Sequence, residues 1–190
     1  ICFAGFGLER RMTDNPCPSL EELGIEPGSF IRKLDKQTHW NAFTDQEDLL
    51  VAAQEVAARV FNEKGEIYSL WKVSTEQEFY GIVAALTAHA NPKDRHIDFI
   101  WLSTSELESA GISFDNIPEG DCIRVKDLHF DAVITPNNAR QLCYELLSRQ
   151  RIAYRCKKAQ TKSILQFQRN LGCKAASESS EPCDCETTSQ

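Results

Sequence analysis

The chain has 190 residues, of which 42% are hydrophobic and 26% are charged, and its formal net charge at pH 7 is −7. These proportions are ordinary for a globular protein, and the length predicts one domain with a sizeable core. No apolar run approaches the about 18 residues of a membrane-spanning helix, so the sequence predicts no transmembrane segment.

The two ends of the chain differ in composition from its middle. The first residue is Ile1 and not Met, which suggests a fragment or a processed product, so an upstream targeting signal stays open. Residues 1–28 are expected to form an extended N-terminal arm, because they are rich in Pro, Gly, Asn and acidic residues. Residues 175–190 are rich in Ser, Thr and Glu, carry no large apolar side chain, and are expected to be a disordered tail. An α/β domain over 29–174 lies between them.

Hydrophobic periodicity in this middle part predicts strands that alternate with helices. Short β-branched or alternating runs indicate strands over 29–34, 66–73, 96–103, 121–126 and 128–134. Helical spacing of apolar residues indicates helices over 45–62, 74–90, 103–111 and 135–147. Capping residues mark their starts, among them a capping box of Ser103 with Glu106 and Thr135 before Pro136. Residues 113–120 are expected to form a loop. This order predicts the α/β class, with a single mixed or parallel sheet of about four strands packed by helices.

The segment Ser148–Lys174 is the most informative part of the chain. It holds eight of the 21 basic residues and no Asp or Glu, within a protein that is acidic overall. On a continuous helix, five cations fall at steps of i, i+4, i+7, i+11 and i+18 and form one stripe, opposite an apolar face interrupted by Gln160. The segment is therefore predicted to be a basic amphipathic helix. The stripe consists of Arg151, Arg155, Lys158, Lys162 and Arg169.

Such a stripe has several interpretations. The plainest is a solvated outer face of a packed helix, or one that faces the domain's own acids. A row of cations also suits the phosphates of RNA or DNA, but aromatic residues are few in the segment and no nucleic-acid motif is found. An acidic protein partner, a groove that takes a basic helix or an anionic membrane surface would recognise the same row.

The eight cysteines do not form a metal-binding or disulfide pattern. Cys183 and Cys185 form a C-x-C pair with Cys173 ten residues earlier, and Cys156 would reach them only by folding back. A structural zinc site normally has four ligands, so a metal site is disfavoured and no cofactor is expected. Several cysteines lie inside apolar patterns, as reduced cysteines do, and we therefore expect an intracellular, cytoplasmic protein.

Catalytic constellations find no motif to support them. Two spatial cysteine–histidine pairs are open, Cys122 with His129 and Cys143 with His96. Asp98 and Asp131 lie inside apolar strands and could act together if they project from neighbouring strand ends, although an outward-facing position is the simpler expectation.

We therefore expect a non-catalytic binding or regulatory α/β domain that engages a macromolecule through the basic C-terminal helix. One alternative is a nucleic-acid-binding protein that holds the RNA or DNA backbone through the same five cations. The other is an enzyme with an unrecognised cysteine–histidine or carboxylate site.

Overall fold

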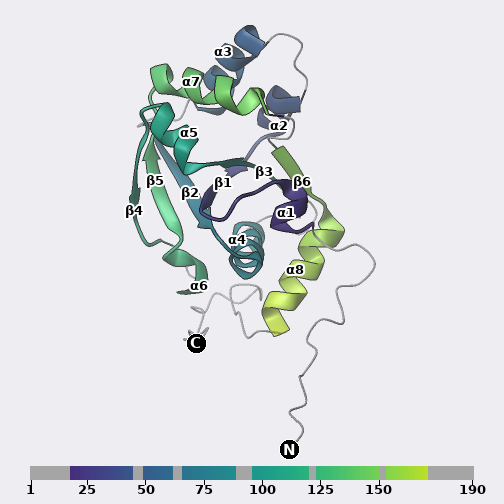
Figure 1. Cartoon of the computed structure of the whole chain (residues 1–190). Helices are drawn as coiled ribbons and strands as arrows, with labels where there is room; N and C mark the ends of the chain where they lie inside the picture. The colour runs from purple at the N-terminus through teal and green to yellow at the C-terminus, as the bar shows by residue number, and fades with distance from the viewer. Residues whose placement is uncertain are drawn as a thin grey trace, which may run out of the picture.

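The computed structural model describes residues 18–44, 49–61, 66–88, 96–119, 123–149 and 153–170. Residues 1–17 and the tail predicted over 175–190 lie outside this part. Helices lie on both faces of one sheet (Figure 1). The elements in chain order are α1 (Leu20–Leu23), β1 (Ser29–Leu34), α2 (Gln37–Thr44), α3 (Leu49–Val60), β2 (Ile67–Val73), α4 (Glu76–Ala88), β3 (Ile97–Leu102), α5 (Thr104–Ser109), β4 (Ser113–Asn116), α6 (Ile123–Lys126), β5 (His129–Val133), α7 (Pro136–Leu147), β6 (Ala153–Cys156) and α8 (Lys158–Asn170).

The sheet has six strands in the order β4-β5-β2-β1-β3-β6, and every neighbouring pair is antiparallel. The α/β class is confirmed, whereas the expectation of a mixed or parallel sheet is wrong. The reason lies in how the crossovers interleave. Strands β2 and β3, linked by α4, do run in the same direction, but β1 lies between them and is antiparallel to both. Strands β5 and β6, linked by α7, are likewise codirectional and separated by three strands. Alternation of strands and helices therefore indicated the crossovers correctly but not the neighbours.

The expected number of about four strands is too low, because two edge strands carry weak local signals. Strand β4 occupies the segment predicted as a loop, and β6 lies inside the predicted basic helix. Conversely, the strand predicted over 121–126 is replaced by the short helix α6 at Ile123–Lys126. Each of these edge strands has four residues and pairs on one side only, which is typical of sheets that limit edge-to-edge association.

Two apolar cores lie on the two faces of the sheet. One contains buried residues of α2, α3, α5 and α7 against the even-numbered side chains of β1, such as Phe30 and Leu34. The other contains buried residues of α1, α4, α6 and α8 against the odd-numbered side chains, such as Ile31. This division follows from the strand period of two. It explains why β3, whose residues are all buried, reads as an apolar run that only Asp98 interrupts.

Local sequence signals position several helix starts. The predicted capping box of α5 is confirmed, since Ser103 Oγ accepts from the Glu106 amide at 3.2 Å and Glu106 accepts from the Ser103 amide at 2.7 Å. Thr135 caps α7 with Pro136 in its first turn, as predicted. At α4 the sequence pattern S-x-x-Q of Ser74 and Gln77 indicates a capping box, but the observed one is one residue later. The Glu78 carboxylate accepts from the Thr75 amide instead, because a charged acceptor outcompetes an amide.

Part of the segment predicted as an arm packs on the body. Helix α1 begins with a capping box of Ser19 and Glu22, and Leu20 and Leu23 are buried in the second core. The Leu20 amide donates to the Glu76 carboxylate at 2.6 Å, which ties α1 to the start of α4. Among the described helices, none has the length and hydropathy to cross a bilayer.

Candidate anionic-partner surface

The segment Ser148–Lys174 does not form the single helix that the sequence predicts. Ser148 caps the end of α7, Ala153–Cys156 form β6, and a new helix, α8, begins at Lys158. Strand β6 pairs with β3 from Cys156 opposite Ile97 to Ala153 opposite Ile100. The pairing satisfies backbone groups at the edge of β3, and this non-local gain outweighs the local preference for helix. The five-residue stripe therefore does not exist as predicted.

Arg155 is engaged within the fold. Its Nε donates to Asp98 Oδ1 at 2.6 Å and its terminal nitrogen to Asp98 Oδ2 at 2.5 Å, a two-point ion pair. The guanidinium also donates to Gln37 Oε1 at 2.8 Å and lies 4.7 Å from the ring centroid of Trp40. The hydrogen bond to Asp98 raises the pKa of Arg155 above its ordinary value. Because its charge is neutralised by Asp98, this residue is poorly suited to hold an external anion.

Lys158 and Lys162 are the two predicted site residues that the structure places on the surface together. They lie one turn apart on α8 and both are exposed. Position 169 is also in α8, seven residues after Lys162 and so within about 20° of it around the helix axis. The side chain of Arg169 lies outside the described part of the chain, as does the whole of Arg151.

The opposite face of α8 packs on the second core. Ile164 and Leu165 are buried there, and Phe167 contacts Tyr80 of α4 with ring centroids 6.3 Å apart. Gln160, which interrupted the apolar face in the sequence, is buried because it serves the helix start. Its Oε1 accepts from the Lys157 amide at 2.8 Å, and its Nε2 donates to the Tyr154 hydroxyl at 2.9 Å. The amphipathic character predicted for this segment therefore holds for α8 alone.

Lys157 is a surface cation that the sequence interpretation left out. It is exposed immediately before α8. On one continuous helix Lys157 fell outside the stripe. In the structure it lies in the turn between β6 and α8, directly before Lys158 at the helix start. The alternation of Ala153 and Arg155 against Tyr154 and Cys156 was the one signal that could have revealed the strand and thereby this position.

The predicted cysteine–histidine pairs gain no support. Cys122 lies outside the described residues. Cys143 is fully buried in the first core, and burial strongly raises the pKa of its thiol, which disfavours the nucleophilic thiolate. His96 has an exposed ring at the start of β3, where its Nε2 lies 3.9 Å from Asp98 Oδ2.

The two strand carboxylates are not brought together. Asp98 and Asp131 belong to β3 and β5, which β1 and β2 separate. The outward-facing expectation is wrong for Asp98, which is 4% exposed and paired with Arg155. Asp131 is partly exposed, and its Oδ1 lies 3.7 Å from Nε2 of the buried His129. The Nδ1 of His129 lies 2.7 Å from the Ile117 carbonyl, to which only an N–H can donate.

In the described ranges, no group of three or more His, Cys, Asp or Glu side chains is arranged to hold a metal ion. Cys173, Cys183 and Cys185 lie outside those ranges. No protein-family model, curated protein or solved structure matches this chain. The interpretation of α8 therefore depends on its geometry and charges alone.

Proposed function

We propose that this chain is a non-catalytic, intracellular binding domain that engages an acidic segment of a protein partner through the cations of α8. The observation that carries the proposal is the division of α8 into two faces. Ile164 and Leu165 are buried against the body, while Lys158 and Lys162 stand exposed one turn apart. A helix fixed in this way presents its ammonium groups at about 6 Å intervals along the axis.

The size of this surface favours a protein partner over nucleic acid. Proteins that hold a duplex through its backbone make about 6–10 phosphate contacts. With Arg155 paired to Asp98, the described cations of this face are Lys157, Lys158 and Lys162. Carboxylates spaced at i and i+4 on a partner helix would match Lys158 and Lys162 directly, because i and i+4 residues lie on one face of a helix. The acidic remainder of the chain would also repel a polyanion.

The test compares two folded charge variants. Lys158→Glu/Lys162→Glu reverses the charge of the proposed surface. Arg155 is left unchanged, because loss of Arg155 would leave the buried Asp98 unpaired. Arg59→Glu/Arg140→Glu makes the same change in net charge on α3 and α7, on the other side of the sheet. Binding is measured by anisotropy with a labelled helical peptide that carries Glu at i, i+4 and i+11, and with single-stranded RNA and duplex DNA, at 50 and 200 mM salt.

We expect the intact chain to bind the acidic peptide and the α8 variant to lose at least about tenfold in affinity, since two attractive pairs become repulsive. The α3/α7 variant should bind within about twofold of the intact chain. Equal losses in both variants would show non-specific attraction and would contradict the proposal. Tighter binding of RNA or DNA than of the peptide, lost in the α8 variant, would assign the surface to nucleic acid instead.

A further inference from the structure

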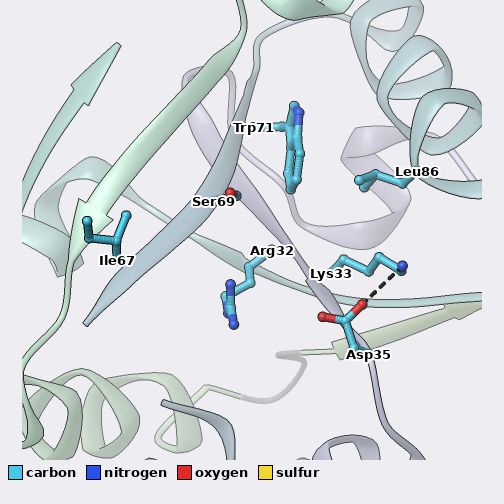
Figure 2. Close-up of a pocket in the computed structure, with 7 residues that line it drawn as sticks. All are labelled: Arg32, Lys33, Asp35, Ile67, Ser69, Trp71 and Leu86. Atoms are coloured by element: carbon cyan, nitrogen blue, oxygen red, sulfur yellow. Dashed lines mark ion pairs between the residues drawn. The ribbon is translucent and has the colours of Figure 1, made fainter. Parts of the chain in front are cut away.

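A pocket opens where β1 and β2 separate. The two strands pair from Ser29–Ile31 to Trp71–Val73, and beyond Ile31 and Trp71 they diverge. Figure 2 shows Arg32 between the diverging strands, with Trp71 and Leu86 on one side of the space and Lys33 and Asp35 on the other. The pocket has a volume of about 250 Å³, which is at the small end for ligand sites and suits a molecule of fragment size. Its lining consists of Arg32, Lys33, Asp35, Ile67, Ser69, Trp71 and Leu86.

One wall of the pocket is apolar. Trp71 is half-buried in the sheet, where its ring lies 5.1 Å from that of His129, its partner on the neighbouring strand β5, so its position is fixed from the side. Leu86 projects from the last turns of α4 beside it. A fixed indole next to an aliphatic side chain is a surface on which a flat apolar group packs well.

The opposite wall presents two opposite charges side by side. Lys33 Nζ lies 3.0 Å from Asp35 Oδ1, and the two side chains are 36% and 57% exposed. A ligand with only a carboxylate could reach Lys33 but would be repelled by Asp35, and a ligand with only an amine would meet the converse penalty. A zwitterion satisfies both, with its carboxylate at Lys33 and its ammonium at Asp35.

Arg32 also lines the opening between the strands, but its side chain points to the other face of β1. Its guanidinium is buried there over the ring of Tyr68, 4.6 Å from the centroid. Lys33, on the same face of the sheet as Trp71, is therefore the group that we assign to a carboxylate. The Ser69 hydroxyl, on the floor, is a further donor and acceptor.

We propose that this pocket binds a free aromatic α-amino acid, with its ring against Trp71 and Leu86 and its charged groups on the Lys33–Asp35 pair. The site shares no residue with α8, so this proposal does not rest on the proposed function. The ligand is identified by its chemistry: an apolar flat group separated by a short carbon chain from adjacent positive and negative charges.

The experiment titrates the full chain with L-phenylalanine by calorimetry and by NMR, following the Trp71 indole N–H, which is assigned by its disappearance in Trp71→Leu. The matched ligands are 3-phenylpropionate and phenethylamine, each of which keeps the ring and lacks one charge. The matched variants are Lys33→Gln, Asp35→Asn and Lys72→Gln. Lys72 neighbours Trp71 in β2 but points to the other face of the strand, so it controls for loss of a lysine.

We expect saturable binding of phenylalanine, weakened at least about fivefold in Lys33→Gln and Asp35→Asn and absent in Trp71→Leu, with Lys72→Gln unchanged. Each one-charge ligand should bind at least about fivefold more weakly than phenylalanine. Retention of circular dichroism and thermal unfolding in each variant separates loss of the site from loss of the fold. No saturable binding of phenylalanine, equal binding of 3-phenylpropionate, or binding that the pocket variants do not change would overturn the proposal.

Discussion

Cys143 shows how its surroundings set the chemistry of a single side chain. It lies on the inner face of α7, fully buried among apolar residues of the first core. A thiolate in such a place would lose its hydration without gaining a partner, and burial therefore strongly raises the pKa of the thiol. The residue is a packing group of the core whose proton is retained at any physiological pH.

This raised pKa predicts a loss of stability in alkali. An unfolded thiol has a pKa of about 8.5, so above that pH the unfolded chain releases a proton that the folded chain keeps. The contribution is fully present below about pH 8.5. Above it, the free energy of unfolding should fall by up to about 1.4 kcal/mol per pH unit on account of this group.

The measurement is urea unfolding between pH 6 and pH 10 for the intact chain, Cys143→Ala and Gln141→Ala. The stability difference between the intact chain and Cys143→Ala should be constant up to about pH 8 and should then shift in favour of the variant. Gln141 is exposed on the same helix and does not titrate, so its variant should follow the pH profile of the intact chain. Parallel profiles for all three proteins would show that Cys143 does not behave as described.

At the scale of elements, the ion pair of Asp98 and Arg155 joins three segments that are remote in sequence. Asp98 belongs to β3, Arg155 to the edge strand β6, and the same guanidinium contacts Gln37 and Trp40 of α2. Strand β6 has four residues and, among the described strands, pairs with β3 alone. Side-chain contacts of this kind therefore add to the backbone pairing with β3 that holds the strand in place.

Removal of one charge from this pair should loosen the edge of the sheet. Asp98→Asn leaves the guanidinium without its carboxylate, and we expect a loss of about 2 kcal/mol, less than the about 3–5 kcal/mol of a pair buried on both sides, because Arg155 is 32% exposed. Amide exchange of β6 should accelerate more than that of β2. Asp115→Asn, the same change at an exposed position of β4, should stay within about 0.5 kcal/mol of the intact chain. A similar loss of unfolding free energy in both variants would show that the Asp98–Arg155 ion pair has no specific role at this edge.

The same pair shows why part of the candidate site could not be predicted. The helix over 158–170 and the exposure of Lys158 and Lys162 follow from local periodicity, which the sequence displays directly. The position of Arg155 depends on Asp98, 57 residues earlier, and on an open edge of β3. Local signals could not reveal that partner, and a segment free of acids looked like one helix. Strand β4, which pairs only with β5, was missed for a similar reason.

At the scale of the whole molecule, the sheet contributes side chains to both cores that the described residues form. Helix α7 packs on one face and α8 on the other, and the two crossovers, β2–α4–β3 and β5–α7–β6, lie on opposite faces. The crossover from β2 to β3 passes over β1, and the crossover from β5 to β6 passes over β2, β1 and β3. Unfolding of either face would therefore remove the support of strands that the other face needs, and the domain should unfold as one unit.

This arrangement predicts a particular pattern of additivity. Leu142→Ala truncates a buried residue of α7, with an expected cost of about 2–5 kcal/mol, and Ile164→Val trims a buried residue of α8, with an expected cost of about 0.5–1.5 kcal/mol. The two residues lie in different cores, so their costs should add within about 0.5 kcal/mol. Val56→Ala in α3, which packs against α7 in the same core as Leu142, should instead deviate from additivity when combined with Leu142→Ala.

Every variant should show one unfolding transition, with coincident near- and far-ultraviolet circular dichroism, because the shared sheet couples the two faces. Two separated transitions in Ile164→Val would mean that the α8 face melts independently, and would refute a single cooperative domain.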